Sequence, residues 1–344
     1  MSPDESPGLG WAVLGASWIA EAFVIDAIRS VPGSEVVGVY STSAERGRSY
    51  AERTGVREVW SSLESALADQ RVEAVFVGTR NELHHDQVLA AAAAGRHILC
   101  EKPLALTASD AIDMRDAAVA AGVVLATNHA FRDQAPLRKM REMIAAGTIG
   151  TPVAARTFFG VTLIDRVKTW RLSDRVAGGV LLDVSVHTVD ILRHLLDSEV
   201  AAVQAMIGNQ GVAAAGVEDI ATGTLLFENG VLSNFHDSYT VNHVPSSVEV
   251  HGDAGSLVAT GVLSVHPAGD LRLMVDGVAH SVDSGPMIGP YMMTLRSFTY
   301  AVRGAGAPSA SADDGIRSLE AVIAAHRSAS TGQMVQVARL GESA

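Results

Sequence analysis

The sequence contains a single cysteine, Cys100, among its 344 residues. One cysteine cannot form an internal disulfide or a multi-cysteine metal site, so we expect a buried strand residue and a reducing cytoplasm. No apolar run approaches the about 18 residues of a membrane span, and the N-terminus lacks the basic and apolar regions of a secretory signal. With 26 Lys and Arg against 38 Asp and Glu, the net charge of −12 argues against nucleic acid or an anionic membrane surface as a partner.

The length suggests roughly two domains, at about 150 residues each. From residue 11 to about residue 128, short β-branched runs alternate with Ala-rich amphipathic stretches, which predicts an α/β domain with a doubly wound, parallel Rossmann sheet over residues 1–128. Residues 129–344 show alternating runs separated by turn signals, which predicts an α+β domain with a large, mainly antiparallel open sheet, whose last helix can pack back on the first domain. The open face of such a sheet needs covering, which favours a homodimer or homotetramer.

The first predicted strand, Trp11–Leu14, runs into a glycine-rich turn of the dinucleotide-binding type, in which Gly15 keeps the first glycine. Ser17 and Ala20 replace the second and third. The first glycine permits the tight turn, the small second residue lets the backbone approach a pyrophosphate, and the following helix offers its first N–H groups to the phosphates. The motif is weak alone, but its place at the start of a βαβ pattern favours a dinucleotide site.

The end of the second predicted strand, Glu35–Tyr40, bears on the choice of dinucleotide. NAD-binding folds usually place an acid there, whereas this chain has Ser41, Thr42 and Ser43. Small hydroxyls leave room for a 2′-phosphate that Arg46 can bind, so NADP(H) is favoured over NAD(H). The alternative is a serine N-cap followed by a solvated arginine.

Two further motifs carry candidate chemistry. Glu101-Lys102-Pro103 follows a predicted strand at its carboxyl edge, where open α/β sheets bind ligands and where a lysine can donate to the oxygen of a reacting carbonyl or hydroxyl. Downstream, Asp183, His187 and Asp190 are spaced to share one face of a helix, with the histidine as a proton donor or acceptor. The alternatives are a surface turn for the first motif and satisfied polar groups for the second; no metal site is expected.

Two weaker segments complete the candidates. Residues 79–84 follow the predicted strand Ala74–Val77, so their side chains would rim the same sheet edge, unless they only start a helix. Trp170 and Arg171 could stack on a sugar or cover a nicotinamide, although an isolated tryptophan is more often part of a core.

Together these motifs resemble the glucose–fructose oxidoreductase/inositol dehydrogenase family, often written Gfo/Idh/MocA, over most of the chain. The strongest markers are Glu101-Lys102-Pro103 and the pattern GG-x₃-D-x₃-H-x₂-D at residues 178–190.

The resemblance implies roles for particular positions. The pyrophosphate would be held after Gly15 by Ala16, Ser17, Trp18 and Ile19. The 2′-phosphate would be surrounded by Ser41, Thr42 and Arg46. The ribose and nicotinamide would be lined by Thr79, Asn81, Leu83, His84, Glu101, Lys102 and Asn128. From the second domain would come Trp170, Arg171 and Tyr291.

The resemblance further implies an NADPH-dependent reductase that transfers hydride to the carbonyl of a sugar-like ketone. His187 would protonate the developing alkoxide, Lys102 would stabilise its charge, and Asp183 would position His187 or the hydroxyls of a sugar or polyol substrate. Two alternatives stay open: an NAD(P)-dependent inositol or aldose dehydrogenase of the same family, and a catalytically silent NADP(H)-binding sensor.

Overall fold

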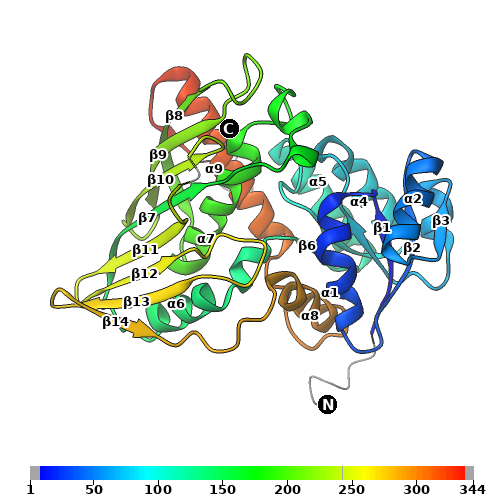
Figure 1. Ribbon diagram of the computed structural model, residues 1–344, viewed down its shortest axis with the longest axis horizontal. Helices are drawn as coiled ribbons and strands as arrows, with labels where there is room; N and C mark the ends of the chain where they lie inside the picture. The colour runs from blue at the N-terminus through cyan, green and yellow to red at the C-terminus, as the bar shows by residue number, and fades with distance from the viewer. Residues whose placement is uncertain (1–7, 242, 338–344) are drawn as a thin grey trace. The chain divides into compact units, whose positions relative to one another are not determined.

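The computed structural model describes residues 8–241 and 243–337, which divide into two compact units (Figure 1). The first unit comprises the described chain up to Ala130 together with Tyr291–Ile316. The second comprises Phe131–Pro290 and the described residues from Arg317 onward. The division falls after Ala130 and assigns Tyr291–Ile316 to the first unit; domains over residues 1–128 and 129–344 stay a prediction from the sequence.

The first unit is built on a six-stranded parallel sheet. Its strands are β1 (Gly10–Leu14), β2 (Glu35–Tyr40), β3 (Glu58–Trp60), β4 (Ala74–Val77), β5 (His97–Cys100) and β6 (Leu125–Thr127). Its helices are η1 (Ala20–Val24), α1 (Ile25–Ser30), α2 (Ala44–Thr54), α3 (Leu63–Ala68), η2 (Asn81–Leu83), α4 (His84–Ala93), α5 (Ala108–Ala121) and α8 (Pro290–Val302). The strand order β3-β2-β1-β4-β5-β6 is that of a dinucleotide-binding fold, whose ligands bind beyond the carboxyl ends of β1 and β4, where the order reverses.

The return of α8 to the first unit has a packing reason. Phe298 of α8 lies with its ring centroid 5.1 Å from that of Trp11 on β1, and both side chains are fully buried. Further along, Ser311 forms an antiparallel bridge with Ala126 of β6. These contacts join positions far apart in the chain, and the sequence pattern does not reveal which core a terminal helix joins.

The second unit contains a nine-stranded sheet in the order β14-β13-β12-β11-β7-β10-β9-β8-β15. Its strands are β7 (Pro152–Gly160), β8 (Val200–Gly208), β9 (Ile220–Phe227), β10 (Leu232–Ser238), β11 (Ser247–Gly252), β12 (Ser256–Thr260), β13 (Asp270–Val275), β14 (Val278–Val282) and β15 (Val335–Gln336). Its helices are η3 (Ala130–Asp133), α6 (Ala135–Ala145), η4 (Asp165–Val167), η5 (Trp170–Leu172), η6 (Leu181–Ser185), α7 (Val186–Leu196) and α9 (Ala312–Thr331), the first residue of η3 and the first residues of α9 belonging to the first unit. All strand pairs are antiparallel except β7 with β10, which confirms the predicted fold class.

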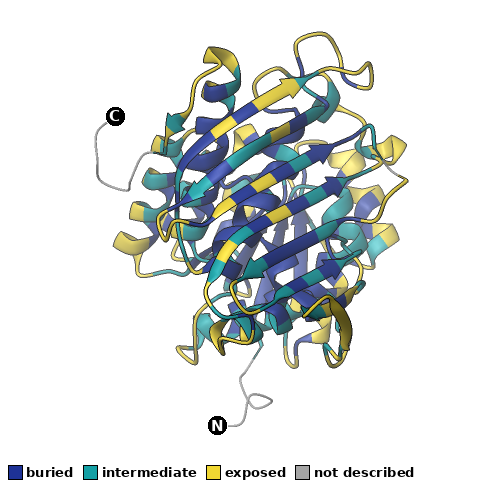
Figure 2. Ribbon diagram, turned by 90° about the vertical axis from the view of Figure 1, so that its left-hand side faces the viewer, coloured by how far each residue is buried: buried dark blue, intermediate teal, exposed yellow. Residues whose placement is uncertain are grey.

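The two faces of this sheet differ. Inward side chains such as Leu225, Phe235 and Val250 are buried, and helices α6 and α7 pack against other strands of the sheet, α7 on β7 and α6 on β12 and β13. On the opposite face, exposed and half-buried residues alternate with buried ones along strands such as β7 and β10 (Figure 2). Of the described helices, none is long and apolar enough to cross a membrane.

Candidate active site

The turn after β1 leaves no room for a side chain at its glycine. Gly15 has a φ of +99°, and a Cβ built on it would lie 2.8 Å from the Cγ2 atom of Thr79, which follows β4. Any side chain here would therefore clash where two loops of the sheet edge meet. The chain becomes helical at Trp18, so the first N–H groups of the helix begin directly at the turn.

A second group of polar side chains follows β2. The Arg46 guanidinium donates long hydrogen bonds of 3.4 Å to the hydroxyls of Ser41 and Thr42. Ser43 caps helix α2 by accepting from the backbone N–H of Arg46 at 3.3 Å. The serine N-cap of the alternative interpretation is therefore present, and the arginine over the small hydroxyls belongs to the same turn, so the 2′-phosphate site stays a prediction.

The segment that carries Lys102 is held from beneath by His84. The Lys102–Pro103 peptide is cis, and Nδ1 of His84 lies 3.0 Å from the carbonyl oxygen of Pro103. Since a carbonyl only accepts, this nitrogen carries the proton. Burial lowers the pKa of His84, whose side chain is fully enclosed. In the structure the enclosed ring of His84 supports the Lys102 segment, and the expected contact of His84 with the cofactor stays a prediction.

Asn128 and Glu101 form a buried pair at the same sheet edge. The Asn128 amide donates to Oε1 of Glu101 at 2.6 Å, and the Asn128 backbone N–H donates to the Cys100 carbonyl at 2.7 Å. The Oδ1 atom of Asn128 is buried and has no hydrogen-bond partner among the described residues. Such an acceptor fits a ligand that brings an N–H or O–H donor. Cys100 itself is fully buried in β5, as predicted, and burial raises the pKa of its thiol.

Three aromatic side chains form a cluster next to the turn at Gly15. The Trp18 ring meets Phe23 edge-on at 5.7 Å, and Phe23 stacks on Tyr291 at 5.2 Å. Burial and the charge of Glu101 raise the pKa of Tyr291. Tyr291 was expected to come from the second domain; it belongs to the first unit, because this stacking forms part of that unit's packing.

The residues after β4 differ in burial and in hydrogen bonding. Thr79 donates its hydroxyl to Gln87 at 2.9 Å, Asn81 is buried, and Leu83 is exposed. They form the short 3-10 helix η2 before α4, so a helix does start here, although neither helix has a side-chain hydrogen bond at its N-cap.

In the second unit, Asp183 lies in the π-helical segment η6 that leads into α7. Its Oδ1 accepts from Nε of Arg171 at 3.2 Å, and its Oδ2 accepts from the hydroxyl of Tyr239 at 2.9 Å. Burial raises the pKa of Tyr239 well above its usual value, so the phenol keeps its proton and donates. The carboxylate is thus fixed at both oxygens.

His187 lies one helical turn after Asp183, in α7. Its ring lies 4.4 Å from the ring centroid of Phe131 and 6.5 Å from that of Phe159. Two phenyl rings restrict the orientation of the imidazole and provide an apolar side to its surroundings.

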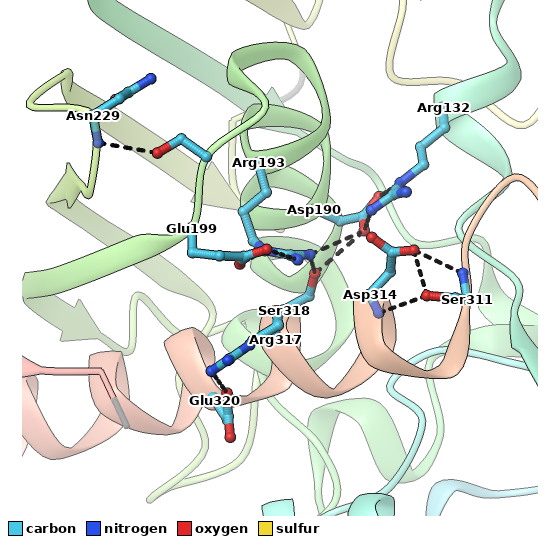
Figure 3. Close-up of polar contacts among 11 residues, drawn as sticks. Arg132, Asp190, Arg193, Glu199, Asn229, Ser311, Asp314, Arg317, Ser318 and Glu320 are labelled. Carbon is cyan, nitrogen blue, oxygen red and sulfur yellow. Dashed lines mark hydrogen bonds and ion pairs between the residues drawn. The ribbon is translucent and has the colours of Figure 1, made fainter. Parts of the chain in front are cut away.

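Asp190, the third polar residue of the helix motif, belongs to a buried ionic network (Figure 3). Its two oxygens accept from Arg132 at 2.6 and 2.7 Å, and Oδ1 also accepts from Ser318 at 3.2 Å. Arg193 donates to Ser318 at 2.9 Å and to both oxygens of Glu199 at 2.6 and 2.7 Å. This network ties α7 to η3, to α9 and to the chain before β8, so Asp190 anchors the helix that carries His187.

Trp170 and Arg171 form a stacked pair in η5. The guanidinium carbon of Arg171 lies 4.6 Å from the Trp170 ring centroid, and both side chains are half-buried. Trp170 is therefore no core residue, in contrast to the alternative interpretation of an isolated tryptophan.

Sequence reasoning missed the residues that hold these groups in place. Tyr239, Phe131 and Arg132 contact Asp183, His187 and Asp190 across long stretches of chain, and no local spacing marks them. Across residues 8–241 and 243–337, no group of three or more His, Cys, Asp or Glu side chains could hold a metal ion.

A Rossmann sheet with a glycine turn after its first strand, followed in the chain by an open-sheet unit with Asp183 and His187 on one helical segment, is typical of dinucleotide-binding oxidoreductases. The description "Oxidoreductase family, NAD-binding Rossmann fold" matches residues 9–129, and "GFO/IDH/MocA C-terminal domain" matches residues 137–258. The chain belongs to the Gfo/Idh/MocA oxidoreductase family, as the sequence motifs predict.

Individual proteins of the family are similar to this chain over nearly its whole length. The motifs also predict a similarity to bacterial 1,5-anhydro-D-fructose reductase, and the enzyme of that name from Ensifer adhaerens is 43% identical over 95% of this chain and 98% of its own length. Myo-inositol 2-dehydrogenase from Thermotoga maritima is 28% identical over 88% of this chain and 90% of its own. Among solved structures, aldose-aldose oxidoreductase from Caulobacter crescentus, complexed with glycerol, superposes with a TM-score of 0.87 at 26% identity, covering 96% of this chain and 99% of that one.

Proposed function

We propose that this chain is an NADPH-dependent reductase of a sugar-like ketone, with 1,5-anhydro-D-fructose as the first substrate to test. The observation that carries the cofactor choice is the Arg46 guanidinium over the hydroxyls of Ser41 and Thr42, at a strand end without a carboxylate. A 2′-phosphate would find a bidentate cation there, whereas a ribose 2′-hydroxyl would find no acidic acceptor. The relative from Ensifer adhaerens supports the substrate class.

The residues of the first unit fit this cofactor on two counts, the cradle at Gly15 that a Cβ would fill and the buried Oδ1 acceptor of Asn128. The residues proposed to hold NADPH are Gly15, Ala16, Ser17, Trp18, Ile19, Ser41, Thr42, Arg46, Thr79, Asn81, Leu83, His84, Glu101, Lys102, Asn128, Trp170, Arg171 and Tyr291. When bound, NADPH supplies the hydride for the carbonyl carbon of the substrate.

The proposed chemistry of the chain is confined to the carbonyl oxygen. Lys102 stabilises the negative charge that develops there, and His187 gives a proton to the resulting alkoxide. Asp183 positions His187 or a neighbouring hydroxyl of the substrate. The apolar rings of Phe131 and Phe159 favour this role, because they fix the plane of the imidazole that transfers the proton.

A second candidate is oxidation of a ring hydroxyl by the same residues in reverse, as in an inositol or aldose dehydrogenase. The likeness to myo-inositol 2-dehydrogenase favours including it. A silent NADP(H)-binding sensor is disfavoured, because a chain without chemistry has no need for both Lys102 and His187.

The test is a panel of keto-sugars, aldoses and inositols, assayed in both directions by nicotinamide absorbance with NADPH, NADH, NADP⁺ and NAD⁺. We expect the highest kcat/KM for reduction of a keto-sugar with NADPH. A higher kcat/KM for polyol oxidation would replace the proposal by the second candidate, and turnover of none of these compounds would overturn both.

We also propose that the open face of the nine-stranded sheet is covered by another copy of the chain, as a homodimer or homotetramer. Met206 and Leu232 project from this face with exposed fractions of 73% and 54%, and Phe158 stacks on His236 beside them. Light scattering coupled to size-exclusion chromatography tests this, and a monomer at micromolar concentration contradicts it.

A further inference from the structure

The segment that follows β10 brings a buried tyrosine to the candidate site. Tyr239 is 4% exposed, and its hydroxyl lies 2.9 Å from Oδ2 of Asp183 and 3.3 Å from the carbonyl oxygen of Gly179. The same Gly179 carbonyl accepts from the Asp183 backbone N–H at 3.2 Å. One phenol therefore contacts both the side chain of Asp183 and the first turn of the helical segment that holds it.

The opposite oxygen of this carboxylate is held independently. Nε of Arg171 donates to Oδ1 of Asp183 at 3.2 Å, so a neutral donor and a charged donor fix the two oxygens. Asp183 sits in the π-helical segment η6, and π-helical turns occur often at functional sites because they redirect a side chain. A side chain redirected in this way needs partners that hold it in one rotamer, and Tyr239 and Arg171 supply them.

We propose that Tyr239 is a positioning residue of the proposed reduction: its hydroxyl fixes the carboxylate of Asp183, and through it the geometry of the proton transfer at His187. This inference rests on the proposed function, since it needs Asp183 to act on the substrate or on His187. The tyrosine touches neither substrate nor cofactor in this scheme; its whole effect passes through Asp183.

The competing explanation is that Tyr239 only fills the interior of the second unit. Tyr239→Phe keeps the ring and removes the hydroxyl, so it separates packing from hydrogen bonding. A hydrogen bond to a charged group is typically strong enough that its loss changes a rate by about 10- to 100-fold. We therefore expect Tyr239→Phe to lower kcat on the active keto-sugar by about that factor, with an unchanged Kd for NADPH measured by nicotinamide fluorescence.

A double-mutant cycle with Asp183→Asn provides the decisive readout, because an effect that passes through Asp183 vanishes when the carboxylate is absent. In the Asp183→Asn background, Tyr239→Phe should lower kcat/KM by less than about threefold. The control is Ser328→Ala, which removes another buried hydroxyl of the second unit, one that donates to the Gln333 carbonyl at 2.6 Å. It should lower the melting temperature without changing kcat.

Two results overturn the inference while leaving the proposed function standing. One is a Tyr239→Phe variant with kcat within about threefold of the wild type. The other is an equal loss of kcat/KM in both backgrounds, which would show that the Tyr239 hydroxyl acts by a route other than the Asp183 carboxylate. If the wild type oxidises polyols instead, the same cycle is run on that reaction, so the reductase proposal fails separately from the inference. A wild type without turnover in either direction overturns both.

Discussion

Replacing Asp190 should destabilise the second unit more than any other single loss of an ion pair there. Asp190 is 1% exposed, and both oxygens accept short hydrogen bonds from Arg132, which is 5% exposed. Asp190→Leu leaves the guanidinium of Arg132 in the interior without either of these two bonds. The perturbation therefore removes a charge whose counter-charge stays buried.

The magnitude follows from that burial. Removal of one partner of a buried pair costs about 3–5 kcal/mol, because the remaining charge has lost its water and now its partner. For a unit of this size, 1 kcal/mol shifts the melting temperature by about 2–4 °C. We therefore expect Asp190→Leu to melt roughly 10 °C below the wild type. Arg132→Met combined with Asp190→Leu removes both charges, so the double variant should lose clearly less than the sum of the single losses.

A matched control is an exposed ion pair between α6 and the end of α7. Arg141 of α6 pairs with Asp197 at the end of α7 at 2.9 Å, but both side chains are open to solvent. Arg141→Met should therefore cost less than about 1 kcal/mol. Urea unfolding followed by circular dichroism measures all four variants. A loss of less than about 1 kcal/mol for Asp190→Leu, or strictly additive losses in the double variant, would refute the reasoning.

Three further predictions address the cofactor, the chemistry and pH. Ser41→Asp should shift preference from NADPH toward NADH, because a carboxylate beside Arg46 repels the 2′-phosphate; equal affinity of the wild type for both cofactors in a fluorescence titration contradicts this. Lys102→Ala and His187→Ala should each lower kcat by on the order of 10²–10³-fold, about 3–4 kcal/mol of barrier, with far smaller changes in the Kd for NADPH; near wild-type turnover removes the assigned role. Burial raises the pKa of Asp237 to about 7, so between about pH 4 and 7 the folded state keeps a proton that the unfolded state has lost. The free energy of unfolding then falls as pH rises through this window, by on the order of 1.4 kcal/mol per pH unit. In thermal unfolding, Asp237→Asn should therefore become more stable relative to the wild type from pH 5 to pH 7. A stability difference that does not change with pH contradicts this.

The first unit could be predicted closely because its elements carry strong local signals. The strands Glu35–Tyr40, Ala74–Val77 and His97–Cys100 have the predicted bounds, since continuous β-branched runs between helices mark buried parallel strands. The sequence did not reveal β3 and α3, which are only 3 and 6 residues long. Elements of that length bury too few side chains to leave a periodic pattern.

The predictions were weakest where a residue's role depends on distant chain. The spacing of Asp183 and His187 pointed to a helix, but not to the π-helical segment that holds Asp183, because that turn depends on partners outside the helix. His84 shows the same limit from the other side. Its position after a strand predicts a ligand contact, but it does not reveal that the carbonyl of Pro103, 19 residues away, is the acceptor for its ring.

The carboxyl end of β10 explains why chemical residues are easier to predict than their supports. Asp237 is the penultimate residue of β10, and Tyr239 directly follows the strand. The first accepts from the hydroxyl of Thr188 at 2.9 Å, and the second donates to Asp183 at 2.9 Å. The helix that carries His187 is thus held on both sides of that residue by one strand end. The proposed chemistry requires particular side chains at fixed spacing within the helix. Holding the helix in place requires only a buried hydrogen-bond donor or acceptor at a suitable position on the sheet. Many sequences satisfy the second condition, so only the first leaves a motif.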